Sequence, residues 1–229
     1  MAAEDDHDDR LGHRARLRRR FLEAGAEALA DYELLELLLF QARPRGDVKP
    51  LSKRLVARFG SFAEAVSAPA DALARVDGMG EASVAALKTA HAAATRLLGQ
   101  AIRDRPVLSS WSQLLDYCRV AMASLPVEEV RVLYLDRKNR LIRDERQGRG
   151  TVDHTPLYPR EVVKRALELG ASALIVVHNH PSGDPSPSQA DIAMTRQLSE
   201  AAAALGLVLH DHLIVARGGH TSFRSAGLL

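Results

Sequence analysis

The position of the β-branched runs is the feature that most constrains the fold of this chain. Before residue 106 the apolar residues recur at helical spacing, and no convincing strand appears. After it, β-branched runs alternate with helical segments, as is typical of an α/β or α+β domain. The runs are residues 129–136, 172–180 and 207–216. The sequence therefore predicts an α+β chain with an all-helical domain at 1–105 and a sheet-containing domain at 106–229.

The predicted helices can be placed from their apolar periodicity and their end signals. In the first domain they are residues 31–40, 48–60, 61–68 and 81–102, and in the second 111–124, 159–169 and 188–205. Asp31 and Ser61 are the expected N-caps of two of them, and Gly60 is the expected end of another. Pro106, within a charged cluster, marks the domain boundary.

Composition excludes several classes of protein. With 46% hydrophobic and 26% charged residues, the chain resembles an ordinary soluble globular protein. A net charge of +2 implies no particular partner, and the single cysteine, Cys118, suits a reducing compartment. The acidic N-terminal segment does not read as a signal peptide, and the longest apolar runs are far too short to span a bilayer. We therefore expect a cytoplasmic protein with no membrane partner.

The segment "VVHNHPSGDPSPSQAD" carries the residues of greatest chemical interest. His178 and His180 end a continuous apolar run, and alternate residues of a strand point to one side, so both imidazoles should face the same way. Ser188 is the expected N-cap of the next helix and Asp191 its third residue. Two histidines and one aspartate are suitable zinc ligands. The alternative is a surface loop that carries incidental histidines.

The same segment matches a known signature. His178, His180, Pro181, Ser188 and Asp191 have the spacing of the JAMM (MPN/JAB) metallohydrolase motif. The longer segment around this motif, "LYPREVVKRALELGASALIVVHNHPSGDPSPSQADI", resembles the bacterial RadC family, and the resemblance extends over nearly the whole chain. It implies that the second domain is a three-layer, deaminase-like α/β domain with a mixed sheet and a Zn²⁺ site.

The resemblance also implies the roles of two further residues. The JAMM family uses a glutamate on an earlier strand as general base, and its spacing to Asp136 selects Glu128. Adjacent residues of a strand point to opposite faces, so only one of Glu128 and Glu129 can reach the metal, and this alternation alone does not say which. The serine of the family's motif, here Ser188, helps to hold the oxyanion, although one rotamer cannot both do this and cap the helix.

Other histidines are less informative. His210 and His212 also fit strand parity, but no carboxylate follows at a suitable spacing. Asp211 and His212 resemble the RadC pattern, and we interpret His212 as a structural residue or one that supports the site through Asp211. His154 lies in a stretch that the family retains near its site, and no role is assigned to it.

The first domain contains a candidate DNA-binding element. "VDGMGEASVAALK" resembles a helix-hairpin-helix, in which Gly78 and Gly80 permit a tight turn and backbone amides can bind a phosphate. Residues 10–20 hold six arginines and no acid, although residues 1–100 as a whole contain 15 basic and 15 acidic side chains. The alternatives are a solvated helix face and a surface that binds protein.

Three functions are therefore compared. The first is a zinc-dependent hydrolase of JAMM type that acts on a protein or peptide substrate by amide or isopeptide cleavage, near non-specifically bound DNA. The second is a non-catalytic DNA-repair accessory protein with a structural zinc. The third is a metal-dependent nuclease, which ranks last because histidine ligands suit zinc better than magnesium.

Overall fold

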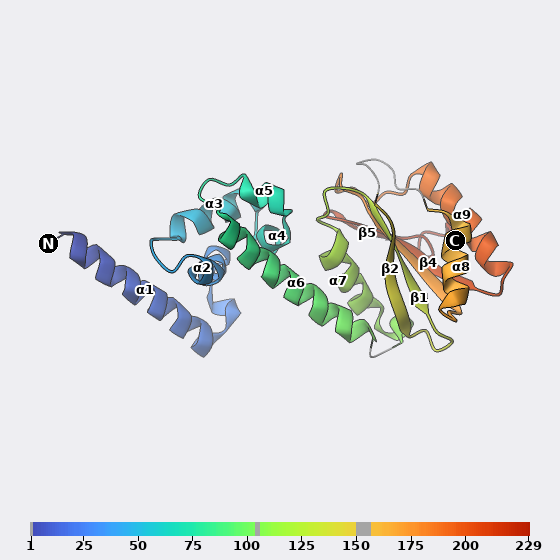
Figure 1. Cartoon of the computed structure of the whole chain (residues 1–229), viewed down its shortest axis with the longest axis horizontal. Helices are drawn as coiled ribbons and strands as arrows, with labels where there is room; N and C mark the ends of the chain where they lie inside the picture. The colour runs from blue at the N-terminus through green and yellow to red at the C-terminus, as the bar shows by residue number, and fades with distance from the viewer. Residues whose placement is uncertain (1, 104–105, 150–156) are drawn as a thin grey trace. The chain divides into compact units, whose positions relative to one another are not determined.

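The computed structural model describes residues 2–103, 106–149 and 157–229. They form two compact units, Met1–Ala93 and Ala94–Leu229, and each is described by itself (Figure 1). The division falls inside helix α6 (Glu81–Arg103), because Ile102 near the end of this helix packs into a core of the second unit. The domain bounds expected from sequence, 1–105 and 106–229, stay a prediction.

The first unit is all helical. Its elements are α1 (Ala2–Ala24), a 3-10 turn η1 (Ala26–Ala28), α2 (Asp31–Ala42), α3 (Lys49–Phe59), α4 (Phe62–Ser67), α5 (Ala70–Ala74) and the first part of α6. Leucines of α2 and α3, such as Leu35, Leu39 and Leu55, are fully buried in its core. Helices α1 and α5 are not among those predicted, because α1 is charged on most sides and α5 is only five residues long.

Two predicted caps in this unit have different outcomes. Ser61 is the N-cap of α4, and its hydroxyl accepts a hydrogen bond from the Glu64 N–H at 3.1 Å. Asp31 is not the N-cap of α2; Ala30 occupies that position. The Asp31 carboxylate instead accepts from the Phe62 N–H at 2.8 Å, so it ties α2 to the start of α4.

The second unit contains a mixed five-stranded sheet in the order β2-β1-β3-β4-β5. The strands are β1 (Glu129–Leu135), β2 (Leu141–Arg149), β3 (Ala173–Asn179), β4 (Val208–Ala216) and β5 (Gly219–Ser222). Strands β3 and β4 are parallel, and the other pairs are antiparallel. The edge strands β2 and β5 are not among the predicted strands, since β2 is rich in charged residues and β5 has only four residues.

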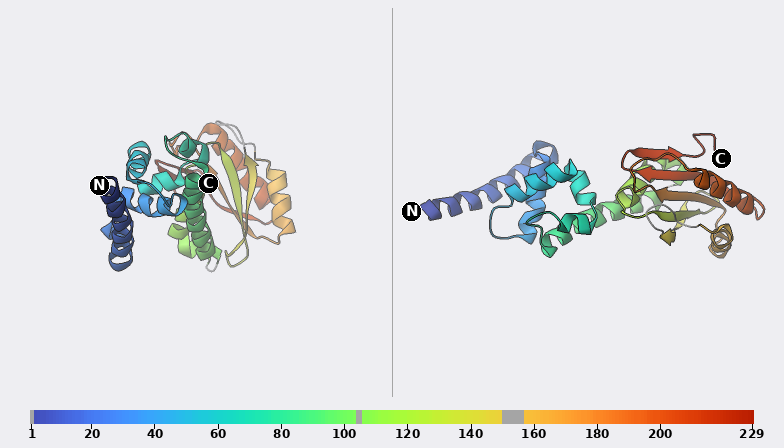
Figure 2. Two further views of the ribbon diagram at one scale, coloured as in Figure 1. Left: turned by 60° about the vertical axis from the view of Figure 1, so that its left-hand side comes forward. Right: turned by 90° about the horizontal axis from the view of Figure 1, so that it is seen from above.

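Helices cover both faces of this sheet. They are α7 (Trp111–Met122), preceded by a 3-10 turn η2 (Val107–Ser110), α8 (Pro159–Glu168) and α9 (Gln189–Ala203). Helix α7 packs with Ile175 and Leu213 on one face, whereas α8 and α9 pack with Leu174 and Val176 on the other (Figure 1 and Figure 2). This three-layer arrangement confirms the α+β fold expected from sequence. Strand β3 is buried along its whole length, which explains its continuous apolar run.

An irregularity in β4 decides which face its histidines occupy. The β3–β4 register shifts between Leu174, which pairs with Leu209, and Ile175, which pairs with Asp211. His210 is the extra residue of this bulge. The expectation that His210 and His212 share a face of the strand is therefore wrong, because the bulge breaks the alternation between them.

No helix in the described part of the chain combines the length and the apolar character needed to cross a bilayer.

Candidate metal centre

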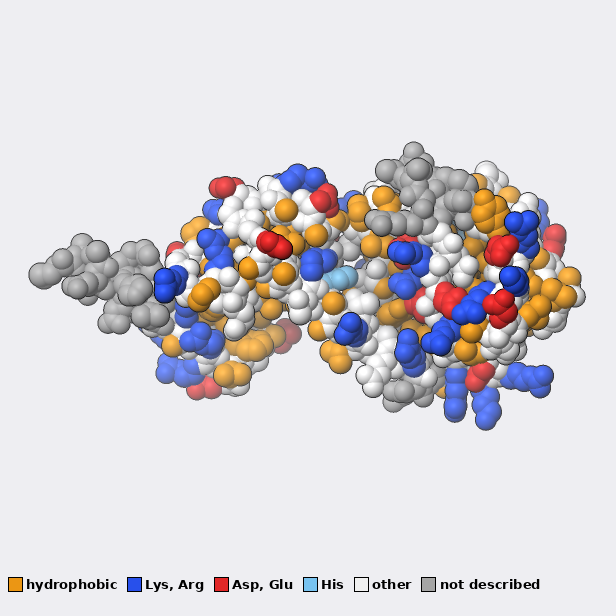
Figure 3. All heavy atoms as spheres, viewed as in Figure 1, with side chains coloured by type: hydrophobic (Ala, Val, Ile, Leu, Met, Phe, Trp, Pro, Cys, Tyr) orange, Lys and Arg blue, Asp and Glu red, His pale blue; other side chains and the backbone are white. Residues whose placement is uncertain are grey.

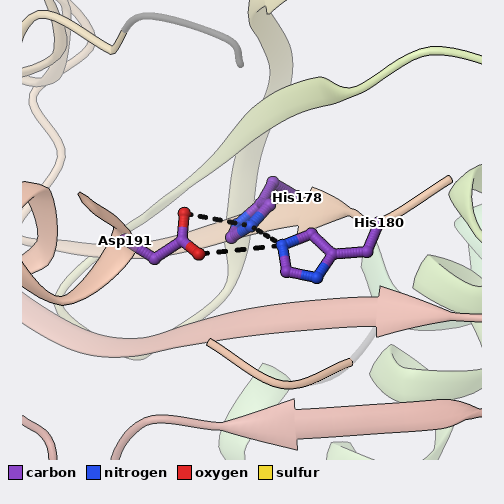
Figure 4. Close-up of side chains that lie close together, drawn as sticks. All are labelled: His178, His180 and Asp191. Carbon is purple, nitrogen blue, oxygen red and sulfur yellow. Dashed lines mark hydrogen bonds and ion pairs between the residues drawn. The ribbon is translucent and has the colours of Figure 1, made fainter. Parts of the chain in front are cut away.

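Two imidazoles meet at the carboxyl end of the buried strand β3. His178 is the penultimate residue of β3 and only 1% exposed, and His180 follows the strand directly. Their side chains point to one side, as strand parity predicts, and their Nε2 atoms lie 2.9 Å apart (Figure 4).

The third group, the Asp191 carboxylate, lies in the first turn of helix α9. Ser188 is the N-cap of α9 and Asp191 its third helical residue, as the sequence predicted. The two form a capping box, in which the Ser188 N–H and Oγ–H both donate to Asp191 Oδ2 at 2.8 and 2.6 Å. Since these bonds fix the carboxylate, the local rules for helix capping also orient a candidate ligand.

The three side chains lie at distances that suit one metal ion. Asp191 Oδ1 lies 3.4 Å from His178 Nε2, and Asp191 Oδ2 lies 3.7 Å from His180 Nε2 (Figure 4). Ligand atoms bound to zinc at about 2.1 Å in a tetrahedron are about 3.4 Å apart. Within the described residues, His178, His180 and Asp191 form a group that could hold a metal ion.

Burial and hydrogen bonding set the charges of this group. Burial lowers the pKa of His178 to about 4 and holds the pKa of His212 well below its ordinary value, so both rings are neutral at pH 7. The pKa of His180 is raised, chiefly by its interaction with the Asp191 carboxylate, which lies 3.7 Å from His180 Nε2. Burial alone would raise the pKa of Asp191, but its interaction with the His180 ring and its hydrogen bonds from Ser188 lower it. Asp191 is therefore a carboxylate.

His212 contacts His178 directly, through its own ring. The His212 ring is fully buried, and its Nε2 lies 2.7 Å from His178 Nδ1. The side chain of Asp211 instead accepts hydrogen bonds from the Ser222 hydroxyl and from the backbone N–H groups of His212 and Arg224. The Asp211 side chain therefore does not connect His212 to the centre in this structure, and the role of His212 stays a prediction.

His210 lies outside this network. His210, displaced by the bulge, pairs through Nε2 with Asn139 Oδ1 at 2.7 Å in the β1–β2 turn. His154 lies outside the described residues.

The two candidate bases lie in different surroundings. Val130 of β1 pairs with His178 in the antiparallel ladder, and paired residues point to the same face. Glu128 lies directly before β1, two residues ahead of Val130, and its charge contributes to the raised pKa of His180. Glu129 points to the opposite face, where its carboxylate lies 3.6 Å from Arg146 and 4.0 Å from Arg131.

Residues 181–187, which connect the ligands, are anchored on the turn between β4 and β5. The Gly218 N–H donates to the Gly183 carbonyl oxygen at 3.0 Å. The same loop carries the Asp184 carbonyl oxygen, which lies 2.8 Å from His180 Nδ1. A carbonyl can only accept, so His180 carries its proton on Nδ1 and directs Nε2 toward the centre.

Gly218→Ala tests this anchor. An added Cβ would lie 2.6 Å from the Gly183 carbonyl oxygen, so the loop must move. We expect the free energy of unfolding to fall by roughly 1–3 kcal/mol, and metal affinity to weaken because the partner of His180 shifts. Denaturant titration and metal titration measure both effects. Gly80→Ala is the control, since nothing lies within 4 Å of an added Cβ there; equal losses in the two variants would contradict the anchor.

Comparison with known proteins identifies the family. A family model described as a RadC-like JAB domain matches residues 108–228, and one described as UPF0758 N-terminal matches residues 10–85. The chain is 66% identical over 213 residues to a UPF0758 protein of Rhodobacter capsulatus, covering 93% of this chain and 100% of that protein. The chain belongs to the UPF0758 family. A UPF0758 protein of Ruegeria pomeroyi is 58% identical over 217 residues, covering 95% of this chain and 97% of that protein.

The match to the RadC-like JAB domain confirms the resemblance drawn from sequence. It spans all residues of the candidate metal centre, from Glu128 to His212. JAB domains include metallohydrolases, so a His and Asp group at this place in a UPF0758 chain is consistent with a metal site.

The UPF0758 N-terminal match covers most of the glycine hairpin, which the structure places before α6. Gly78 has a φ of +88°, a backbone conformation that favours glycine. Arg43 Nη1 donates to the Gly78 carbonyl oxygen at 2.8 Å, and Arg54 Nη2 donates to that of Asp77 at 3.1 Å. Sequence spacing gave no signal for these two exposed arginines, because they come from α3 and from the end of α2.

The arginine run is partly structural. Arg14 donates to the carbonyl oxygens of Arg43, Pro44 and Gly46 beyond the end of α2, and Arg20 pairs with Glu33. On the visible face of the first unit, basic side chains lie among acidic and apolar ones and do not form one stripe (Figure 3).

Proposed function

We propose that the chain is a zinc-dependent hydrolase of JAMM type with metallopeptidase or isopeptidase chemistry. His178, His180 and Asp191 would hold the ion. The observation that carries the proposal is the convergence of two imidazole Nε2 atoms and a carboxylate at spacings suited to zinc. The charge of Glu128, which contributes to the raised pKa of His180, supports it.

The donor set fits zinc better than a hard cation. Two nitrogens and one carboxylate oxygen suit zinc, whereas magnesium and calcium prefer oxygen ligands. Three protein ligands leave a fourth position open, as in catalytic and not in closed structural sites. When bound, zinc would supply a Lewis acid and lower the pKa of water to near neutrality.

The residues of the chain would supply proton transfer and orientation. Glu128 would accept the proton of the attacking water and deliver it to the leaving nitrogen. Ser188 donates its hydroxyl to Asp191 in this structure, so its contribution here is to orient a ligand. The oxyanion role of Ser188 stays a prediction and requires another rotamer.

Metal analysis and a substrate screen together test the proposal. The purified protein should contain about one zinc per chain, and should cleave members of a panel of peptides and isopeptide-linked conjugates. Chelation should stop cleavage and added zinc restore it. Zinc without cleavage of any panel member would favour a structural ion in a non-catalytic accessory protein.

We also propose that the first unit binds duplex DNA weakly and without sequence preference. The Gly78–Gly80 hairpin at the start of α6, flanked by Arg43 and Arg54, supports this role. The few available basic groups imply dissociation constants on the order of micromolar or weaker at physiological salt, which rise steeply with added salt.

Gly80→Val tests the hairpin without straining the fold. Nothing lies within 4 Å of an added Cβ at Gly80, so the branch point of a valine side chain meets open space, whereas the side chain would block the approach of a phosphate. Loss of one such contact should weaken binding roughly 3- to 10-fold, measured by fluorescence anisotropy with a duplex of random sequence. Ala85→Val, at an exposed position of α6, is the control. Equal affinity of Gly80→Val and wild type would favour a protein-binding surface.

A further inference from the structure

The second ring nitrogen of His178 begins a chain of buried hydrogen bonds. His178 Nδ1 lies 2.7 Å from His212 Nε2, and His212 Nδ1 lies 2.5 Å from Thr195 Oγ1. Thr195 Oγ1 in turn lies 2.6 Å from the carbonyl oxygen of Asp191. The three side chains come from β3, β4 and α9 and are at most 1% exposed, so water does not compete for these bonds.

The last acceptor in this series of hydrogen bonds, the Asp191 carbonyl oxygen, fixes the direction of every bond in the series. A carbonyl oxygen can only accept, so the Thr195 hydroxyl proton points to Asp191. The Thr195 oxygen must then accept from His212 Nδ1–H. A neutral His212 ring with its proton on Nδ1 has a bare Nε2, which accepts from His178 Nδ1–H.

We propose that Thr195 and His212 are positioning residues that hold His178 in the tautomer whose Nε2 lone pair faces His180 and Asp191. The opposite tautomer would direct an N–H into the centre and exclude a metal ion. The identity of the ion rests on the function proposed above, whereas the direction of the hydrogen bonds does not.

The surroundings of His212 support this role. Its ring stacks on Phe223, with centroids 4.5 Å apart and planes 27° from parallel, which restricts ring rotation. Asp191 contributes its carboxylate to the centre, and its backbone carbonyl oxygen is the last acceptor in the series of hydrogen bonds. The first turn of α9 thus sets the position of one candidate ligand and the tautomer of another.

A pair of substitutions at Thr195 separates proton direction from packing. Thr195→Val keeps the shape of the side chain and removes the hydroxyl, whereas Thr195→Ser keeps the hydroxyl and removes a methyl group. We expect Thr195→Val to bind zinc roughly 10- to 100-fold more weakly than wild type, and Thr195→Ser to stay closer to wild type. Competition with a chromophoric chelator measures the affinity of the full chain for zinc alone. The proposal is overturned if Thr195→Val binds zinc as tightly as wild type, or if Thr195→Ser binds zinc more weakly than Thr195→Val.

Direct observation of the tautomer gives a second test that needs no metal. Long-range ¹H–¹⁵N spectra of the metal-free wild type should show His178 and His212 protonated on Nδ1 with Nε2 bare. A proton on Nε2 of His178 would overturn the proposal. If wild type binds no zinc, the function proposed above fails, and these spectra still decide the direction of the hydrogen bonds.

Discussion

His178→Ala is expected to lower the zinc content of the purified protein from about one ion per chain to almost none. His178 supplies the most deeply buried nitrogen of the centre. The substitution also leaves His212 Nε2 buried without its donor, which should cost roughly 1–3 kcal/mol of unfolding free energy in the metal-free protein. Loss of the ion removes its contribution to folding as well.

Elemental analysis and denaturant titration, with and without zinc, measure these two losses separately. His220→Ala is the matched control, since His220 is exposed on the edge strand β5 and should keep both zinc and stability. Equal zinc in His178→Ala and wild type would show that the ion binds elsewhere.

Glu128→Gln is expected to keep the zinc and to lower the rate of hydrolysis by roughly 10²- to 10⁴-fold. Glutamine has the shape of glutamate but cannot accept the proton. Because Glu128 is not one of the three proposed ligands and acts on His180 only through its charge, the substitution should change the rate and not the metal content.

Glu129→Gln is a close control, because the two acids are neighbours in sequence and Glu129 pairs with arginines and not with the histidines. It removes the charge beside Arg131 and Arg146 and should leave the rate almost unchanged. Loss of zinc in Glu128→Gln would make Glu128 a ligand. An unchanged rate in that variant would exclude it as the base.

Local rules were sufficient to place the candidate ligands from sequence. The alternation of a strand puts His178 and His180 on one side, and the capping box puts Asp191 in the first turn of α9. These rules operate over a few residues, so they hold before the tertiary structure is known. The split into a helical part and a sheet-containing part follows from periodicity in the same way.

What could not be predicted depends on pairing between distant segments. The sequence pattern alone does not decide whether Glu128 or Glu129 is the general base, because that choice depends on how the start of β1 lies against β3. The contact between His178 and His212 depends on a bulge in β4, for which periodicity gives no signal. Thr195 reads in sequence as an ordinary helical residue, and only packing of α9 on β4 brings it to His212.

The double role of Asp191 would link the exchange of an ion at this site to the opening of a helix. The first turn of a helix frays more easily than its centre. Each time the first turn of α9 opens, the Ser188 cap and the Asp191 carboxylate are displaced together, because each holds the other. The escape rate of an ion held here would therefore follow the opening rate of a single helical turn, and residues that strengthen this turn would lengthen the residence time of the ion without contacting it.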